Sequence, residues 1–185
     1  MLIDEFLPQF EESKSYSVII QAPPDKVYEV LKKSNVADSW VIRFLFGLRS
    51  IPAILSGQHK FNDRQTVTIE DITQSGFMLL GEKPGQELVI GVVGKFWKMS
   101  GNICKDVLPE QFKKFSLPGF SKAVWNFYLE SHGTSETDLS TETRIHCTDP
   151  NSAKKFKRYW TVIAPFSGLI RHEMLKIVKR ESEKI

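Results

Sequence analysis

The most informative polar residue is Ser167, which interrupts the apolar face of an expected C-terminal helix. Placed at 100° per residue, it lies between Ile163, Ile170 and Met174 and should face the interior. Its hydroxyl has two readings. In the first interpretation, which we favour, the hydroxyl bonds back to the carbonyl of Ile163 beside a kink at Pro165. In the second, it orients the polar end of a ligand.

Arg171 follows four residues later, at the edge of the same apolar face. A guanidinium there could bind a ligand carboxylate. It could also pair with Glu142 on the last expected strand, and we favour this structural bridge. By alternation Glu142 shares a strand face with Arg144, while Thr141 and Thr143 take the other, which predicts a small charged network. Because a lone desolvated arginine is costly, we expect some partner for Arg171.

Other reactive residue types form no recognisable site. The four histidines are scattered without the spacing of metal ligands, and Cys104 and Cys147 are far apart. Gly91 and Gly94 lie in or beside an expected strand with no helix after it, so no phosphate-binding loop is predicted. We therefore expect neither a metal nor a cofactor.

Length and composition limit the class of protein. The chain has 185 residues, of which 41% are hydrophobic and 25% charged, as in one soluble globular domain spanning residues 1–185. The net charge of +3, with basic and acidic residues interleaved, does not favour nucleic acid as a partner. The N-terminus lacks the pattern of a signal peptide, so we expect a cytoplasmic protein with reduced thiols. Nothing in the sequence specifies an oligomeric state.

The first part of the chain predicts a strand and two helices. After an irregular lead-in, residues 16–22 form a β-branched run typical of a strand, and the Pro-Pro-Asp that follows opens a helix over residues 24–33. Residues 37–57 predict an amphipathic helix broken near Pro52. We expect it to pack on the domain as a lid, with transient membrane contact as the alternative.

The middle of the chain alternates short strands with turns, which predicts antiparallel hairpins. The longest irregular connection covers residues 105–119. The expected strands are residues 65–72, 77–82, 87–93, 95–100, 122–131 and 137–147.

The last element is a long helix that opens at Asp149-Pro150 and runs to about Glu183. Its apolar side chains fall within one broad wedge, and Pro165 is expected to kink it. Such a helix must bury its apolar face, and the only large partner is the concave face of the sheet.

Two stretches of sequence resemble a known superfamily. Residues 22–31 (APPDKVYEVL) resemble the first strand–helix junction of the START-like, or SRPBCC, superfamily, which includes birch-pollen-allergen-like and polyketide cyclase/dehydratase-like proteins. Residues 139–144 (LSTETR), Trp160 and residues 164–171 (APFSGLIR) resemble a bacterial branch of it with no assigned activity. The resemblance implies an α+β helix-grip fold: a curved antiparallel sheet around the C-terminal helix, with two shorter helices after the first strand.

The resemblance also implies an internal cavity for a lipid, sterol-like, polyketide or aromatic molecule, and it transfers no catalytic residues. We favour a protein that binds or carries such a hydrophobic ligand over the alternatives, a cyclase/dehydratase-like enzyme or a surface interaction module. The expected cavity-lining residues are Phe44, Leu48, Phe77, Leu79, Trp97, Trp125, Phe127, Trp160, Ile163, Phe166, Ser167, Ile170, Arg171 and Met174.

Overall fold

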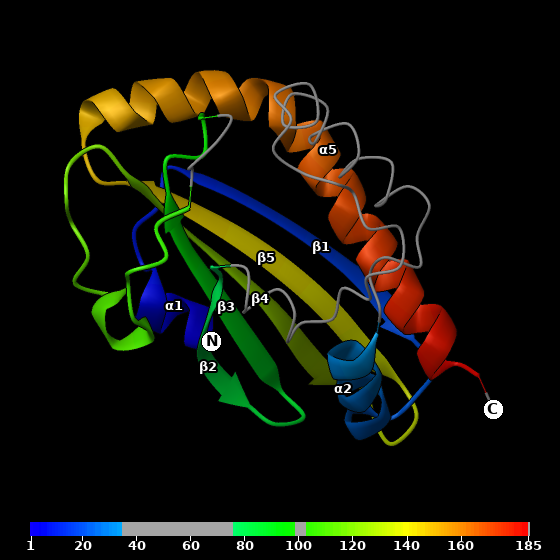
Figure 1. The fold of residues 1–185 in the computed structure, drawn as a ribbon. Coiled ribbons are helices and arrows are strands. Elements are labelled where there is room, and N and C mark those ends of the chain that lie inside the picture. Colours follow the sequence, from blue (N-terminus) through cyan, green and yellow to red (C-terminus); the bar gives the residue numbers. More distant parts are fainter. Residues whose placement is uncertain (35–75, 99–102, 185) are drawn as a thin grey trace, which may run out of the picture.

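The computed structural model describes residues 1–34, 76–98 and 103–184 of the chain (Figure 1). In sequence order the elements are α1 (Leu2–Phe6), β1 (Glu12–Ile20), α2 (Pro24–Lys33), β2 (Met78–Lys83), β3 (Glu87–Gly94), the 3-10 helix η2 (Pro109–Gln111), β4 (Ser121–Ser131), β5 (Thr137–Cys147) and α5 (Pro150–Ser182).

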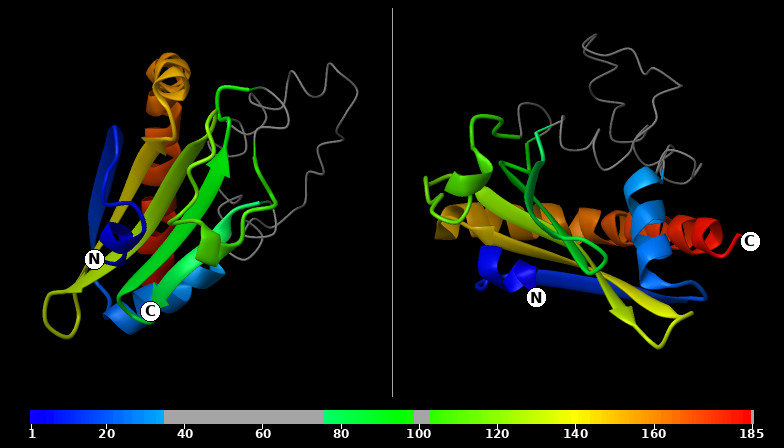
Figure 2. Two further views of the ribbon diagram at one scale, coloured as in Figure 1. Left: turned by 90° about the vertical axis from the view of Figure 1, so that its left-hand side faces the viewer. Right: turned by 90° about the horizontal axis from the view of Figure 1, so that it is seen from below.

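The strands of these ranges form one antiparallel sheet in the order β1-β5-β4-β3-β2. The curved sheet carries α5 and α2 on one face, and α1 packs on the other (Figures 1 and 2). Strand alternation explains both layers, because Val124 of β4 packs with Ile3 on the outer face while Phe127 packs with Leu175 on the inner face. This is the expected α+β helix-grip arrangement.

Helix α5 begins at a well-formed N-terminal cap and bends in its middle part. The Asp149 carboxylate accepts hydrogen bonds from the backbone N–H groups of Asn151 and Ser152, each at 2.9 Å, which satisfies amides that lack a partner within the helix. Pro165 lies inside the helix, and α5 bends in its middle part (Figure 1), as expected of a proline without an N–H.

The C-terminal half of α5 closes the main core. Its side chains Met174, Leu175 and Val178 are at most 3% exposed and pack with the inner face of the sheet. Leu31 of α2 joins the same core. Residues of α5 between Phe156 and Arg171 line a space between this helix and the inner face of the sheet.

Two expectations about the N-terminal and middle regions are wrong. Residues 1–15 are not irregular: they contain α1, and β1 already begins at Glu12. Both features depend on distant partners, since the Glu87 carboxylate accepts hydrogen bonds from the N–H groups of Leu2 and Ile3, and the polar start of β1 pairs with β5. Residues 95–98 form a turn rather than a strand.

Other expected elements lie outside the described residues: the strand over residues 65–72 and the amphipathic lid helix over residues 37–57 with its Phe44 and Leu48. Within the described ranges, no helix is both apolar enough and long enough to span a bilayer. The thiols of Cys104 and Cys147 are free.

Candidate functional site

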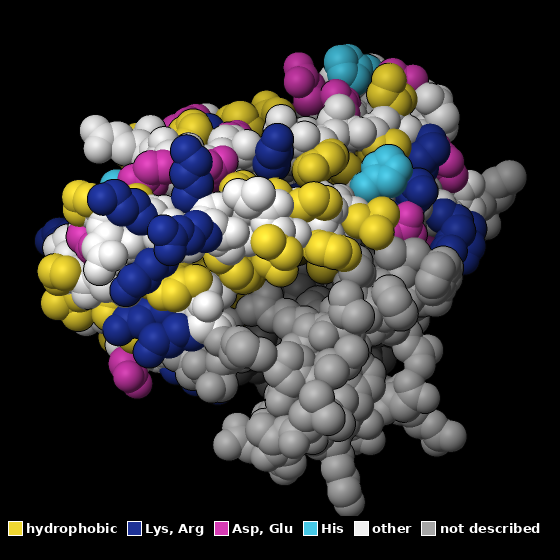
Figure 3. Space-filling model, turned by 90° about the horizontal axis from the view of Figure 1, so that it is seen from above, with side chains coloured by type: hydrophobic (Ala, Val, Ile, Leu, Met, Phe, Trp, Pro, Cys, Tyr) yellow, Lys and Arg dark blue, Asp and Glu magenta, His cyan; other side chains and the backbone are white. Residues whose placement is uncertain are grey.

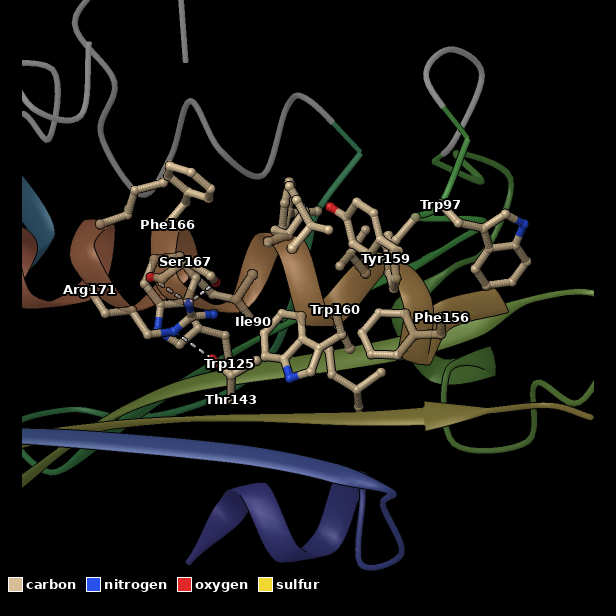
Figure 4. A pocket seen from close by; sticks show the side chains of 18 of the residues that line it. Ile90, Trp97, Trp125, Thr143, Phe156, Tyr159, Trp160, Phe166, Ser167 and Arg171 are labelled. Atoms are coloured by element: carbon tan, nitrogen blue, oxygen red, sulfur yellow. Dashed lines mark hydrogen bonds between the residues drawn. The ribbon is translucent and has the colours of Figure 1, made fainter. Parts of the chain in front are cut away.

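A cavity of about 600 Å³ lies between the N-terminal half of α5 and the inner face of the sheet. Strands β3, β4 and β5 form its floor and α5 forms one wall (Figure 4). Its volume falls within the range of about 300–1,000 Å³ that is usual for small-molecule sites. Nine of the residues predicted from the sequence line it: Phe77, Trp97, Trp125, Trp160, Ile163, Phe166, Ser167, Ile170 and Arg171.

Three predicted lining residues are elsewhere. Phe127 and Met174, 0% and 3% exposed, belong to the packed core, and Leu79 is 41% exposed at the edge of the sheet. Phe127 shares its strand face with Trp125, and Met174 shares its helix face with Ile170. They differ in position along the element, because α5 packs directly on the sheet near Met174, whereas the cavity separates helix and sheet beside Trp125 and Ile170.

Sequence reasoning missed the other half of the described lining. Alternation along β3 and β5 could have found the strand residues among them, and the apolar wedge of α5 already contained Phe156 and Tyr159. The residues missed are Ile90, Val92, Phe96, Lys98, Ala123, Thr143, Ile145, Phe156, Tyr159 and Val162.

One end of the cavity is aromatic. Phe156 and Trp160, one helical turn apart on α5, stack with ring centroids 5.5 Å apart, and Phe96 meets Phe156 edge-on at 6.2 Å. Trp97 and Tyr159 lie at this end as well (Figure 4). Flat, rigid side chains give this wall a large contact area at little cost in side-chain entropy.

The aromatic wall continues to the surface of α5. Val162 and Phe166 both line the cavity and are 63% and 40% exposed, and Leu169 nearby is 42% exposed. Figure 3 shows hydrophobic side chains gathered along this part of the molecule, with basic side chains beside them. The described rim of the cavity on α5 is therefore apolar.

The opposite end of the cavity is built around Arg171 (Figure 4). The Nε–H of Arg171 donates to Thr143 Oγ1 on β5 at 2.7 Å. Its Nη1 donates to the Ser167 carbonyl at 2.9 Å and also to the Ser167 hydroxyl. The guanidinium lies over the ring of Trp125, 5.4 Å from its centroid, and the Trp125 Nε1–H donates to Thr141 Oγ1 at 2.6 Å, which fixes the indole.

Burial changes the electrostatics of Arg171. Protein atoms surround the guanidinium closely enough that desolvation lowers the pKa of Arg171 to about 10, although the nearby Tyr16 opposes this shift. The side chain still carries its charge at neutral pH. No aspartate or glutamate in the described ranges forms an ion pair with it.

Both favoured interpretations of these polar residues are wrong. Ser167 does not bond back to Ile163; its hydroxyl accepts from Arg171. Arg171 does not pair with Glu142, whose carboxylate lies on the outer face of the sheet and binds Arg144 at 2.8 Å. Strand alternation is the reason, since the neighbouring Thr143 is the β5 residue that faces α5. The expected charged network of Glu142 and Arg144 does exist there.

The described lining includes no aspartate, glutamate, histidine or cysteine. These residues therefore supply no carboxylate or imidazole for acid–base chemistry and none of the usual metal ligands. No group of three or more potential metal-ligating side chains occurs elsewhere in the described ranges either. The arrangement offers apolar surface, the partly buried Arg171 guanidinium, the exposed Lys98 and hydroxyl groups.

Comparisons with known proteins return weak structural likenesses only. No protein family profile matches the sequence, and no curated protein matches it. Similar solved structures include a conserved protein from Geobacillus kaustophilus (13% identity, covering 92% of this chain and 94% of that one, TM-score 0.42). A hypothetical protein from Helicobacter pylori is 11% identical over 97% of this chain and 94% of its own, with a TM-score of 0.43. The Zhui aromatase/cyclase from Streptomyces sp. R1128 is 14% identical over 93% of each chain, with a TM-score of 0.33.

Proposed function

We propose that this protein binds a small hydrophobic molecule in the cavity between α5 and the sheet. The proposal rests on a space of about 600 Å³ whose described wall is aromatic and aliphatic apart from the Arg171 end and Lys98. Well-packed interiors leave few voids larger than a water molecule. A space of this size with an apolar wall therefore suits a ligand of low polarity.

Burial of the ligand's apolar surface would supply most of the affinity. At about 0.8 kcal/mol per buried CH₂ group, a ligand of about ten carbons gains roughly 8 kcal/mol, which corresponds to about micromolar binding before ordering costs. Binding and carriage need no further chemistry from the wall, which matches the acid-free set of described lining residues.

A neutral fluorescent probe tests this proposal. N-phenyl-1-naphthylamine emits strongly only in apolar surroundings, and we expect it to bind the wild-type chain saturably with one probe per cavity. Ile163→Trp and Ala123→Phe fill the cavity from the helix and from the sheet, and each should reduce the affinity at least tenfold. Thr161→Trp places the same indole on an exposed position of α5 and should leave binding unchanged.

The proposal fails if the wild type shows no saturable binding. It also fails if the two filled variants, shown to be folded by circular dichroism, bind as well as Thr161→Trp.

A further inference from the structure

We propose that the Arg171 end of the cavity binds an anionic group of the ligand, so that the ligand class is a hydrophobic carboxylic acid. The inference rests on the proposed function, because it assigns a head group to the molecule whose body fills the cavity. Three features of the site support it: the donors left unused around Arg171, the charge balance of the cavity, and the position of Trp125.

Several hydrogen-bond donors around Arg171 have no acceptor in the part of the chain that the structure describes. Arg171 uses Nε and Nη1 within the protein, whereas its Nη2 donates to no described residue. A guanidinium can only donate, so Thr143 Oγ1 and Ser167 Oγ must accept from it. Each hydroxyl then keeps its own proton for another acceptor, and in the described ranges neither proton has one. Among the described residues, one N–H₂ group and two O–H groups of the site therefore have no acceptor.

The charge balance indicates that this acceptor is an anion. Charged side chains are rarely buried without a partner, and Arg171 has neutral partners only among the described residues. The other charged residue of the described lining is Lys98, which is also basic. A bound carboxylate would compensate the desolvation that lowers the pKa of Arg171.

Trp125 restricts the direction from which the anion can approach. Its ring covers one face of the guanidinium, and the contacts to Thr143 and Ser167 occupy the Nε and Nη1 edges. The open Nη2 edge and the two hydroxyls suit the two oxygens of a carboxylate, which accept several charge-assisted hydrogen bonds at once. Beyond this end, the aromatic wall would hold the apolar body of the ligand.

Two probes with the same rings, one neutral and one anionic, separate the contribution of the ligand's head group to the affinity from that of its apolar body. N-phenyl-1-naphthylamine is neutral, and 8-anilinonaphthalene-1-sulfonate adds an anionic group to the same rings. We expect Arg171→Met to weaken the anionic probe about tenfold to a hundredfold, the usual value of a charge-assisted hydrogen bond, and to change the neutral probe less than threefold. Arg171→Lys should restore part of the loss because it keeps the charge but not the planar fork.

The carboxylate itself is tested by displacement. 1-Naphthylacetate should displace the neutral probe from the wild type about tenfold more effectively than its methyl ester does, and this preference should disappear in Arg171→Met. Thr143→Val removes one free hydroxyl at constant shape and should cost the acid about threefold to tenfold. Arg158→Met, which removes an equal charge from an exposed position of the same helix, is the matched control and should change nothing.

The outcomes are distinguishable. Equal binding of the acid and the ester, or equal loss of both probes in Arg171→Met and Arg171→Lys, would overturn the anion site while the proposed function stands. Absence of neutral-probe binding by the wild type would overturn the proposed function itself.

Discussion

Each face of the sheet holds an arginine beside β5, buried on the outer face and partly buried on the cavity face, and the two residues are partnered in opposite ways. Arg144, 8% exposed on the outer face, binds the Glu142 carboxylate through Nε at 2.8 Å and Asp4 through Nη1 at 2.8 Å. Arg171, on the cavity face, has hydroxyl groups, a carbonyl and an indole ring as its partners. Consecutive residues of one strand, Thr143 and Arg144, belong to these two sites.

The pKa directions follow from this difference. At Arg144 desolvation is outweighed by the hydrogen bonds that its guanidinium donates to Glu142 and Asp4, and the pKa of Arg144 rises. At Arg171 desolvation prevails and the pKa falls. An arginine that the protein itself neutralises stabilises the fold. One that the described residues leave without a counter-ion costs stability, and this cost is understandable where a ligand completes the site.

The largest effect is expected on the outer face. Arg144→Met leaves the mostly buried Glu142 carboxylate without its cation, which should lower the free energy of unfolding by about 3 kcal/mol. Urea denaturation followed by circular dichroism measures this. In the double variant Arg144→Met/Glu142→Leu the loss should be smaller than the sum of the single losses; simple additivity would show that the pair is not coupled.

The next largest loss of stability is expected where Gly168 of α5 packs against Tyr16 of β1, beside the Arg171 site. A methyl group on Gly168 would overlap the Tyr16 hydroxyl, so Gly168→Ala should destabilise the fold by about 1–3 kcal/mol. In a Tyr16→Phe background the hydroxyl that the new methyl group overlaps is gone, so the loss should shrink by about 1 kcal/mol or more. An equal loss in both backgrounds would contradict this packing.

On the cavity face the same kind of arginine substitution should be nearly silent for stability. Arg171→Met removes the desolvation cost together with hydrogen bonds to neutral groups worth about 1 kcal/mol each. We expect the unfolding free energy to change by less than about 1 kcal/mol in either direction. A loss as large as that of Arg144→Met would refute the contrast between the two sites and assign Arg171 a structural role.

The smallest effect concerns pH. Hydrogen bonds from the Met1 ammonium and then Arg144 lower the pKa of Asp4 below its usual value. A depressed carboxyl pKa contributes stability above about pH 4, which is lost as the pH falls through the folded-state pKa. Because Asp4 is half exposed, the contribution should be about 0.5 kcal/mol. Asp4→Asn should therefore flatten the acid limb of the stability curve slightly, and an unchanged curve would show that Asp4 adds nothing.

The fold could be predicted where local pattern decides it. Alternation located β3, β4 and β5, the proline pair located α2, and the Asp149-Pro150 cap with its apolar wedge located α5. Helix α1 could not be predicted, because its first amides depend on Glu87, some 85 residues away. The polar residues that begin β1 hid the first part of that strand for the same reason, since they are ordered by pairing with β5.

The sequence indicates which face of each helix or strand points towards the site, but not which residues along that face line the cavity. Periodicity assigned Trp125 and Phe127 to one face correctly, yet only the bend of α5 decides that one lines the cavity and the other fills the core. The expected pairing of Arg171 with Glu142 was wrong for a different reason. Alternation already assigned Glu142 to the face of Arg144, and the bridge to Arg171 was incompatible with that assignment.

The most direct test of the account is the ¹H–¹⁵N spectrum of the arginine Nε–H groups during titration with 1-naphthylacetate, with assignments from Arg171→Lys and Arg144→Lys. We expect a saturable shift of the Arg171 resonance, because an anion joins its guanidinium. The Arg144 resonance should not shift, because its carboxylate partners are already in place. An Arg171 resonance that stays fixed while the acid binds, or two resonances that move together, would contradict it.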